Sequence, residues 1–383
     1  MKSGARYDAA VVGAGPAGAT AARLLASRGL SVVLLEKCSL PRYKTCGGGV
    51  VSRAMPLLPA GIQPVVECAC STAELRLERA GLTFRVRRED PIVRMTMRDR
   101  LDFLLVAAAE RSGAKLCADC RVVGLKENLR GVELITTQGS FLAHWVVAAD
   151  GALSRVARMA GWEKPRGTAP ALELELRVSP GTLDRFRGVA RFDLDAAPAG
   201  YAWIFPKRDH LSVGILSLRK SVPLLKDLLD RYLERSGIHA SDRGDSESHG
   251  FVIPFEPRDR FVRGRVLLAG DAAGLADPVT GEGISFALRS GELAARAVWE
   301  GGLEEGPVAE LYEKWLSRDI LAELALGRKL SSLLYKHTGL RDFLFRRHGQ
   351  RLSEAMADVM MGTRTYRSIL RSPANYWKLL TGS

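Results

Sequence analysis

The most constraining feature of this chain is a glycine pattern near its start, GAGPAG at residues 13–18. Apolar runs at residues 7–13 and 31–36 flank a stretch of small residues at 16–28. The two runs are typical of buried strands, and the stretch between them is typical of a helix. A G-x-G-x-x-G turn between a strand and a helix is the fingerprint of a Rossmann-type dinucleotide-binding fold.

Each part of this turn has a physical task. The first glycine permits the tight turn, the second lets the backbone approach a pyrophosphate, and the third lets the helix pack on the strand. The helix N-terminus offers free N–H groups and a positive dipole end to the phosphates. Glu36, which ends the second strand, can accept both hydroxyls of an adenosine ribose. We expect the nucleotide site to comprise Gly13, Gly15, Pro16, Ala17, Gly18, Glu36 and Lys37.

Periodicity divides the rest of the chain into two kinds of structure. A helix is predicted at residues 98–112, and strands are predicted at 115–123, 132–137 and 141–149. Alternating patterns, typical of an antiparallel sheet with one wet face, occupy residues 171–178, 187–194, 201–205 and 211–218. A further buried strand and three helices are predicted at residues 265–270, from about 283, at 308–336 and at 341–361.

The predicted fold class is therefore α/β, or α+β over the whole chain. We expect a discontinuous Rossmann-type FAD-binding domain at residues 1–165 and 259–310. A mostly antiparallel substrate domain at 166–258 interrupts it, with a contribution from residues ~50–95, and a helical region follows at 311–383.

Composition limits the classes of protein that remain. No stretch reaches the roughly 18 or more consecutive apolar residues of a membrane span, and the N-terminus lacks a secretory pattern. The net charge of +13 suits an anionic substrate, an anionic membrane surface or nucleic acid, but no nucleic-acid-binding motif occurs. Six cysteines, among them Cys117 and Cys120, show no metal-site spacing. We expect a cytoplasmic protein that binds neither nucleic acid nor a metal.

Residues 265–283, RVLLAGDAAGLADPVTGEG, resemble the second flavin motif of the p-hydroxybenzoate hydroxylase-like flavoproteins. The resemblance implies that Asp271 binds the ribityl chain of FAD. It also implies that the P-x-x-G-x-G run brings backbone amides to the flavin ring, where a helix start favours the anionic reduced form. The residues concerned are Gly270, Asp271, Pro278, Gly281, Gly283 and Ile284.

Two further matches favour FAD over NAD. Asp150 and Gly151, in VVAADGALSRVAR, resemble the third motif of the same flavoproteins. Arg98 resembles an arginine that contacts the flavin nucleotide, and we add Val122 to the expected cofactor contacts. FAD is therefore the expected cofactor.

Two more stretches narrow the family. RYKTCGGG at residues 42–49 and PAGYAWIFP at 198–206 resemble motifs of the geranylgeranyl reductase family. That family implies hydrogenation of isolated C=C bonds in a geranylgeranyl or related isoprenoid chain, with a hydride from flavin N5 and a proton. Such bonds are not polarised, so the protein must supply a water-poor channel and accurate positioning.

The resemblance implies catalytic roles for Cys46, Tyr201 and Trp203. Tyr201, Trp203 and Phe205 alternate along one strand, so they share a face and would line the substrate channel. Their π faces favour positive charge at an alkene carbon. Ordinary core aromatics are the alternative reading of the same pattern.

Cys46 precedes a run of three glycines, which lets the backbone pass closely over a flat ring. We expect Gly47 and Gly48 to contact the flavin, and Gly48 and Gly49 to contact the substrate. Cys46 is expected beside the flavin, as a proton donor or as a group that shapes the site. An inert buried thiol is the alternative.

Two other functions stay open. A monooxygenase or halogenase-like enzyme of the same fold shares the FAD motifs, although RYKTCGGG argues against it. A flavin electron-transfer protein without its own substrate is the second alternative. No second G-x-G-x-x-G unit marks an NADPH domain, but NADPH can visit this fold without one. NADPH and a ferredoxin therefore both stay open as the electron donor.

The C-terminal stretch is basic and amphipathic. Residues 341–383 carry eight Lys/Arg and three Asp/Glu. Apolar and aromatic residues accompany them, namely Phe343, Leu344, Phe345, Leu352, Met356, Met360, Tyr366, Tyr376 and Trp377. This combination predicts peripheral contact with an anionic membrane. A helix packed on the protein body, with a solvated charged face, is the alternative.

Overall fold

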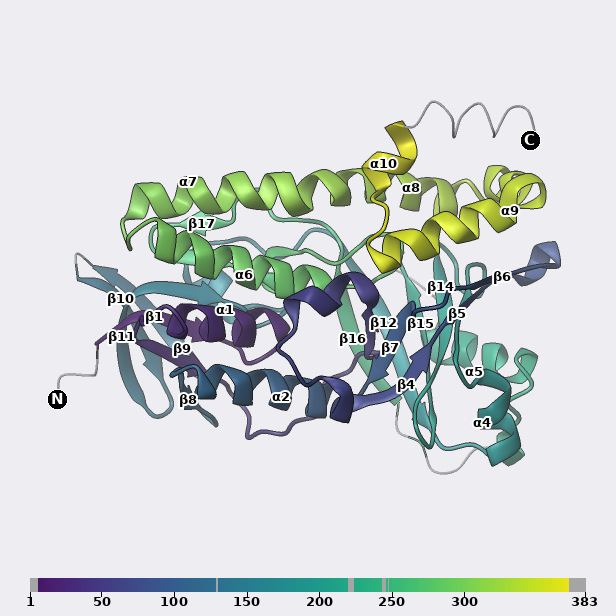
Figure 1. Cartoon of the computed structure of the whole chain (residues 1–383), viewed down its shortest axis with the longest axis horizontal. Coiled ribbons are helices and arrows are strands. Elements are labelled where there is room, and N and C mark those ends of the chain that lie inside the picture. Colours follow the sequence, from purple (N-terminus) through teal and green to yellow (C-terminus); the bar gives the residue numbers. More distant parts are fainter. Residues whose placement is uncertain (1–5, 129, 220–223, 243–245, 247, 372–383) are drawn as a thin grey trace.

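The computed structural model of the chain describes residues 6–128, 130–219, 224–242, 246 and 248–371. Two large sheets lie side by side, and the C-terminal helices run across both of them (Figure 1). The fold class is the mixed α/β class that the sequence predicts. None of the described helices is long and apolar enough to cross a membrane.

The first sheet has eight strands in the order β17-β18-β11-β1-β2-β8, with β10 and β9 continuing from β11. The core from β18 to β8 is parallel. β1 lies between two parallel neighbours, and its last four residues, Ala9–Val12, are buried on both faces, as in a parallel sheet whose faces are both covered. This burial explains their apolar sequence. The strands are Arg6–Val12 (β1), Val32–Leu35 (β2), Lys115–Cys117 (β8), Val122–Asn128 (β9), Gly131–Thr136 (β10), Gly139–Ala148 (β11), Val262–Arg263 (β17) and Val266–Leu268 (β18).

The second sheet has seven strands in the order β16-β12-β15-β14-β13-β5-β6, all antiparallel except the pair β13 and β5. It includes β5 and β6, which precede the rest in sequence by about 80 residues. The strands are Thr72–Leu77 (β5), Leu82–Arg87 (β6), Thr168–Leu176 (β12), Val189–Asp193 (β13), Gly200–Pro206 (β14), Leu211–Ser217 (β15) and Ser248–Pro254 (β16). A small sheet of Gly49–Val51 (β3), Val66–Cys70 (β4) and Val93–Thr96 (β7) joins the two.

Helices cover the outer faces of both sheets (Figure 1). Helix α1 packs so closely on α6 that a Cβ on Gly291 would lie 2.2 Å from the carbonyl oxygen of Ala17. The helices are Pro16–Ala26 (α1), Arg98–Arg111 (α2), Arg155–Met159 (α3), Pro180–Phe186 (α4), Leu225–Arg235 (α5), Ile284–Glu300 (α6), Glu305–Leu316 (α7), Ala322–Lys336 (α8), Thr338–Met361 (α9) and Tyr366–Arg371 (α10).

Two predicted elements are wrong in detail. The strand predicted at 115–123 is two strands, β8 and β9, because Asp119 takes a left-handed conformation with φ 52° and turns the chain. The helix predicted at 308–336 is interrupted at Ser317–Leu321 by a wider π-helical turn. The division of the chain into an FAD-binding, a substrate and a C-terminal helical part stays a prediction.

Candidate active site

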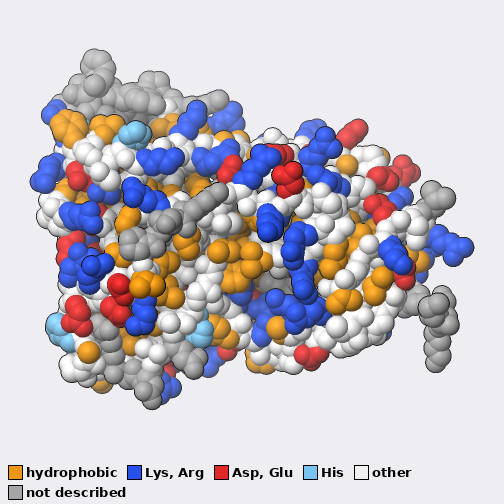
Figure 2. All heavy atoms as spheres, turned by 180° about the vertical axis from the view of Figure 1, so that it is seen from behind, with side chains coloured by type: hydrophobic (Ala, Val, Ile, Leu, Met, Phe, Trp, Pro, Cys, Tyr) orange, Lys and Arg blue, Asp and Glu red, His pale blue; other side chains and the backbone are white. Residues whose placement is uncertain are grey.

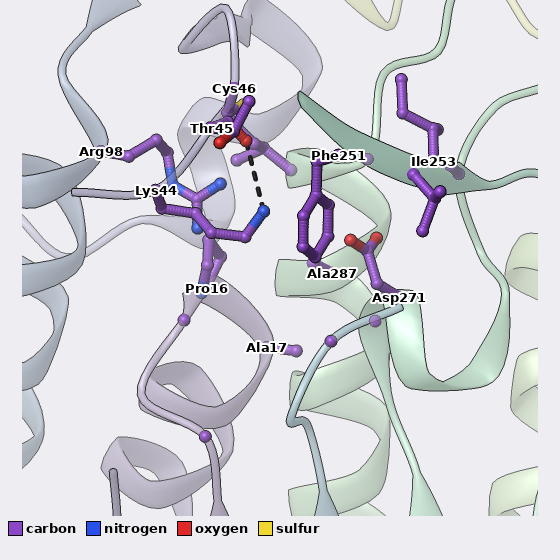
Figure 3. A pocket seen from close by; sticks show the side chains of 18 of the residues that line it. Pro16, Ala17, Lys44, Thr45, Cys46, Arg98, Phe251, Ile253, Asp271 and Ala287 are labelled. Atoms are coloured by element: carbon purple, nitrogen blue, oxygen red, sulfur yellow. Dashed lines mark hydrogen bonds between the residues drawn. The ribbon is translucent and has the colours of Figure 1, made fainter. Parts of the chain in front are cut away.

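A cavity of about 730 Å³ lies between the two sheets. The β1–α1 turn lines one end of it, and strands β12, β14 and β16 line the other. Figure 3 shows the junction of the two ends, where Arg98, Lys44 and Cys46 face Phe251 and Asp271. Every residue that the sequence assigns to the site lines this cavity except Gly18 and Pro278.

The glycine turn has the tight geometry that its sequence predicts. Gly13 has φ +101°, and a Cβ there would lie 2.4 Å from the carbonyl oxygen of Ala149. A Cβ on Gly18 would lie 1.8 Å from the carbonyl oxygen of Gly13, so Gly18 serves packing and not the cavity wall. A Cβ on Gly15 would meet only the guanidinium of Arg98, at 3.8 Å. No side chain caps the start of α1, so its N–H groups are available to a phosphate.

Glu36 is held at the cavity wall by the backbone. Its carboxylate accepts hydrogen bonds from the N–H groups of Ala14 (2.9 Å) and Cys38 (3.2 Å). Arg42 lies 3.5 Å from Glu36 and 3.1 Å from Asp102, so its charge balances both carboxylates. Arg42 therefore belongs to the nucleotide end of the cavity.

Arg98 stands at the first turn of α2 and forms two parallel hydrogen bonds with Asp102, at 2.9 and 3.0 Å. Burial acts to lower the pKa of this guanidinium, but the neighbouring Asp102 and Cys46 outweigh burial, and the pKa is raised. The side chain therefore presents a permanent, rigidly oriented cation next to Gly15.

Asp150 has a role that the sequence did not predict. Its carboxylate accepts hydrogen bonds from the Ser154 hydroxyl (2.5 Å) and from the N–H groups of Arg155 (2.7 Å) and Val156 (3.1 Å). These bonds hold the start of α3 against the cavity. Asp150 lines the cavity, but its oxygens are engaged with the chain itself.

Asp271 and Lys44 lie on two sides of the cavity (Figure 3). Burial raises the pKa of Asp271, while Lys44 and Arg98 act to lower it. The Lys44 ammonium donates to the carbonyl of Thr45 (3.2 Å) and lies 3.6 Å from the centre of the Phe251 ring. Burial, followed by the charge of Arg98, lowers the pKa of Lys44. The Asp271 carboxylate, a hydrogen-bond acceptor, and the Lys44 ammonium, a donor, thus face the same cavity.

The loop at residues 277–283 is fixed from several directions. Asp277 accepts from the N–H of Val279 (2.8 Å) through one oxygen and from the hydroxyl of Tyr366 (2.8 Å) through the other. The hydroxyl of Tyr335 donates to the carbonyl of Val279 (2.6 Å). Two tyrosines from the C-terminal helices α8 and α10 therefore hold a loop that borders the cavity.

The start of α6 differs from the expectation. Glu282 accepts from the N–H of Ser285 (2.6 Å) and pairs with Arg53 at 2.7 Å. Glu282 therefore occupies one N–H group of the helix start, and the charge of Arg53 balances its carboxylate. Pro278 lies away from the cavity, with its Cγ 3.2 Å from the position of a Cβ on Gly327 in α8.

The far end of the cavity is aromatic. Tyr201, Trp203 and Phe205 share one face of β14, as predicted, with ring centres 6.0 and 6.2 Å apart along the row. The Phe192 ring packs 5.3 Å from Phe205. The Tyr201 hydroxyl donates to the carbonyl of Thr280, and burial raises the pKa of Tyr201, so this phenol is a structural donor.

The loop that contains Cys46 is held by a buried lysine. The Lys207 ammonium donates to the carbonyls of Gly47 (2.7 Å) and Thr96 (2.9 Å), and burial lowers its pKa. Gly48 has φ +67°, a conformation that favours glycine, and its N–H donates to the Cys46 sulfur (3.4 Å). A Cβ on Gly47 would lie 2.9 Å from the Trp203 indole nitrogen, so this loop runs directly over the aromatic row.

Sequence reasoning missed several residues of the site. Glu173, Tyr43 and Lys207 were not assigned, although the first two line the cavity. Leucines alternate along β12 and mark one face of the strand. Glu173 lies between two of them and therefore points to the other face, which a reading of the sequence could have found. Lys207 follows directly after the Tyr-x-Trp-x-Phe-Pro run, but its burial depends on contacts made by distant segments.

These residues fit FAD. The open turn at Gly15 leaves room for a pyrophosphate, and Glu36 is placed for the adenosine ribose. Among the described residues, the Asp271 carboxylate has no recorded hydrogen-bond donor, which suits the ribityl hydroxyls. The buried Trp203 indole N–H likewise lacks a partner in that part of the chain. No group of three or more His, Cys, Asp or Glu in the described residues is arranged to hold a metal ion.

Comparison with known proteins identifies the family. A family model described as an FAD binding domain matches residues 6–191. Digeranylgeranylglycerophospholipid reductase 2 of Methanothermobacter thermautotrophicus is 32% identical over 361 residues, covering 86% of this chain and 88% of that protein. The chain belongs to the geranylgeranyl reductase family. FAD is the cofactor of this family member, which is an FAD-dependent oxidoreductase.

Other geranylgeranyl reductases are similar over most of their length. The chloroplastic geranylgeranyl diphosphate reductase of Oryza sativa subsp. japonica is 30% identical over 348 residues, covering 79% of this chain and 68% of that protein. A geranylgeranyl bacteriochlorophyll reductase-like structure from Thermoplasma acidophilum has a TM-score of 0.81 with 23% identity, and the match covers 99% of this chain and 100% of that one. This structural similarity shows a common fold.

The C-terminal helices pack on the body more than the sequence predicts. Phe345, Met360 and Tyr366 are buried, and Leu352 and Met356 pack against the aromatic end of the second sheet. The prediction that these side chains face a membrane is therefore wrong, because the protein body covers them. Phe345 packs with residues of the second sheet, Met360 lies in the core around the first sheet, and Tyr366 packs beside Val279. Phe343 is exposed, Leu344 is half-buried, and Tyr376 and Trp377 lie outside the described residues.

Proposed function

We propose that this protein is a reductase that saturates isolated C=C bonds of a geranylgeranyl or related isoprenoid chain. The observation that carries the proposal is the aromatic end of the cavity, which is lined by Tyr201, Trp203, Phe205 and Phe192. This end is continuous with the part of the same cavity that fits FAD, lined by the β1–α1 turn, Glu36 and Asp271. An apolar chain matches this lining, whereas a polar aromatic substrate does not.

The residues of the cavity position the alkene and exclude water. Bound, reduced FAD supplies a hydride. Trp203 and Phe205 present π faces that stabilise positive charge developing at the tertiary carbon. Lys207 fixes the Gly47 carbonyl, and thereby holds the Cys46 loop over the aromatic row. Closure of the site by apolar side chains strengthens each of these interactions.

Cys46 has two possible tasks within this proposal. The Gly48 N–H that points at its sulfur orients the thiol and keeps the loop in shape. Cys46→Ser replaces the thiol with a hydroxyl, which also carries a proton, and Cys46→Ala removes the donor group altogether. If Cys46 donates the proton, Cys46→Ala loses far more turnover than Cys46→Ser. If Cys46 only shapes the site, the two variants have similar turnover and differ from the wild type in the distribution of partly reduced products.

The direct test is anaerobic. The enzyme is reduced with dithionite, incubated with geranylgeranyl diphosphate or a geranylgeranylated glycerolipid, and its products are weighed by mass spectrometry. A reductase yields products heavier by two hydrogens for each bond reduced. A product that forms only with O₂ and contains its oxygen would assign the protein to the monooxygenase alternative. Reduction and reoxidation without any product would assign it to electron transfer.

We infer that the electron donor, NADPH or a ferredoxin, approaches an exposed basic surface. Arg121, Arg155 and Arg158 line the cavity and are exposed. Figure 2 shows Lys and Arg side chains gathered near the middle of one face, beside hydrophobic side chains. Anaerobic stopped-flow reduction with each donor separates the two, because only the true donor reduces the bound flavin rapidly.

We further propose that the N-terminal half of α9 contacts an anionic membrane. Leu340 is 50% exposed and Phe343 59% exposed. Arg346 and Arg347 are also exposed on this helix. Cosedimentation with phosphatidylserine vesicles at low salt tests the contact. Phe343→Ser weakens binding if this surface docks, and equal binding of the variant and the parent rejects the proposal.

A further inference from the structure

Glu173 is a buried carboxyl that is not among the residues expected to contact FAD. It lies on β12, is 2% exposed and lines the cavity. One of its oxygens, Oε1, accepts hydrogen bonds from the Tyr43 hydroxyl (2.8 Å) and from the N–H of Cys46 (2.8 Å). The structure records no partner for Oε2 among the described residues, so this oxygen is where a proton can reside.

The position of Glu173 in the sheet aims it at the aromatic row. Glu173 pairs with Gly214 on β15, and Gly214 pairs with Trp203 on β14, so the three form one row across the strands. Gly214 lets the indole lie flat over this row, since a Cβ there would be 2.1 Å from the Trp203 ring. The carboxyl and the indole therefore share the same face of the sheet and the same cavity.

A path to solvent begins at Tyr43. Its side chain is 45% exposed, and its ring centre lies 4.5 Å from that of His249 on β16. Its hydroxyl donates directly to Glu173. The phenol therefore connects the buried carboxyl to the surface through one hydrogen bond.

The groups that face Glu173 favour its neutral form. Burial raises the pKa of Glu173, and the charge of Glu175 on the same strand raises it further. The Cys46 N–H, the Tyr43 hydroxyl and the Lys207 ammonium act in the opposite direction without reversing the shift. Glu175 is paired with His210 at 3.0 Å, which limits its influence.

We propose that Glu173 is the acid that delivers the proton for alkene reduction and is recharged from solvent through Tyr43. This inference rests on the proposed reductase function. In the step, the π bond of the alkene breaks, one carbon receives a hydride with both electrons from the reduced cofactor, and the other carbon receives the Glu173 proton. The O–H electron pair stays on the carboxylate. Water then returns a proton by way of the Tyr43 hydroxyl.

Glu173 suits this task better than its neighbours do. The Tyr201 proton is committed to the carbonyl of Thr280. Cys46 is coupled to Glu173 through its own N–H, so a change at either residue alters the position of the other. A carboxylic acid is a stronger acid than a phenol or a thiol, and burial raises the pKa of Glu173, which favours the protonated form that can donate.

The test uses FAD-loaded Glu173→Gln, with Glu175→Gln as the matched control on the same strand. Infrared spectroscopy of the substrate-free enzymes is the first measurement, because a protonated carboxyl gives a band that the amide lacks. Buried Asp271 and Asp277, whose pKa values are also raised, can contribute similar bands, so the band of Glu173 is read from difference spectra. It appears in wild type minus Glu173→Gln and in Glu175→Gln minus Glu173→Gln. FAD absorbance and FAD affinity are measured alongside, and both remain near the wild-type values if the variants fold normally.

Anaerobic turnover is the second measurement. Glu173→Gln lowers the rate of product formation by about 10²- to 10⁴-fold, the usual contribution of a general acid. In the wild type, the rate falls as pH rises through the pKa of Glu173, because only the protonated form donates. Glu175→Gln keeps the low-pH rate and moves this fall to lower pH. Tyr43→Phe retains a normal single turnover but slows steady-state turnover.

The outcomes separate this inference from the proposed function. A Glu173→Gln enzyme with the wild-type rate and pH profile overturns the role of Glu173 while leaving the reductase function intact. A difference spectrum of wild type minus Glu173→Gln that contains no protonated-carboxyl band overturns it without any substrate. Absence of reduced product from the wild type overturns the reductase function, and the inference falls with it.

Discussion

Replacing Tyr366 with Phe tests how the C-terminal helices hold loop 277–283. The lost hydroxyl donates to the carboxylate of Asp277, which is 0% exposed. A hydrogen bond to a charged group contributes about 1.5–3 kcal/mol, compared with about 0.5–1.5 kcal/mol for a neutral pair. After the substitution, Oδ2 of Asp277 keeps, among the described residues, only the more distant Arg53, at 3.7 Å.

Tyr335→Phe is the matched control. It removes a phenol hydroxyl of similar burial from the same loop, but that hydroxyl donates to the neutral carbonyl of Val279. We therefore expect Tyr366→Phe to lower the free energy of unfolding by about 1 kcal/mol more than Tyr335→Phe does. Because 1.4 kcal/mol corresponds to tenfold in affinity, release of FAD should also be clearly easier from Tyr366→Phe, by about fivefold to tenfold.

The assay is urea unfolding of the FAD-loaded enzymes, followed by circular dichroism and by flavin fluorescence. The pH dependence adds a second criterion. Burial raises the pKa of Asp277, and the phenol acts against this shift by stabilising the charged form. The contribution of the phenol is therefore present above the pKa of that carboxyl and disappears as pH falls through it. Equal losses in the two variants, or a Tyr366→Phe loss that does not change with pH, would refute the reasoning.

Three further predictions concern single residues. Gly13→Ala should abolish FAD binding, because the added Cβ would lie 2.4 Å from the backbone oxygen of Ala149. Gly29→Ala is the control: Gly29 has φ +82° but no atom within 4 Å of an added Cβ, so this variant should retain FAD and lose only about 1–2 kcal/mol of stability. Equal FAD content in the two variants would contradict the prediction. A hydrogen bond from Cys70 lowers the pKa of Cys68 to about 6, so Cys70→Ala should move the pH midpoint of Cys68 alkylation upward, and an unchanged midpoint contradicts this. Lys207→Met leaves two carbonyls unpaired, at about 1–3 kcal/mol each, and should weaken FAD binding in fluorescence titrations while circular dichroism stays unchanged; wild-type affinity speaks against it.

Local sequence was sufficient for the nucleotide end of the site. The glycine turn, Glu36 and the flanking strands belong to one continuous strand–helix–strand segment whose pattern is visible in the sequence, and the structure has them as predicted. The face shared by Tyr201, Trp203 and Phe205 follows from strand alternation alone and could equally be predicted from the sequence.

The remainder of the site depends on tertiary contacts. Lys207 and Glu173 look like ordinary charged residues in sequence, and only the pairing of strands places them beneath the Cys46 loop. The apolar face of α9 was interpreted as a membrane surface because periodicity does not say what covers a face. Phe84 covers part of it, since a Cβ on Gly349 would lie 2.0 Å from its ring.

The contact between Tyr366 and Asp277 has a consequence for biosynthesis. Chains emerge from the ribosome N-terminus first. The Gly13–Gly18 turn is therefore made early, but β1 waits for β11 and β18 before its sheet is complete. Tyr366 is translated after every residue that lines the cavity. The nascent protein can therefore bind the adenine end of FAD well before it can enclose the flavin ring. Full retention of the cofactor is then among the last steps of folding.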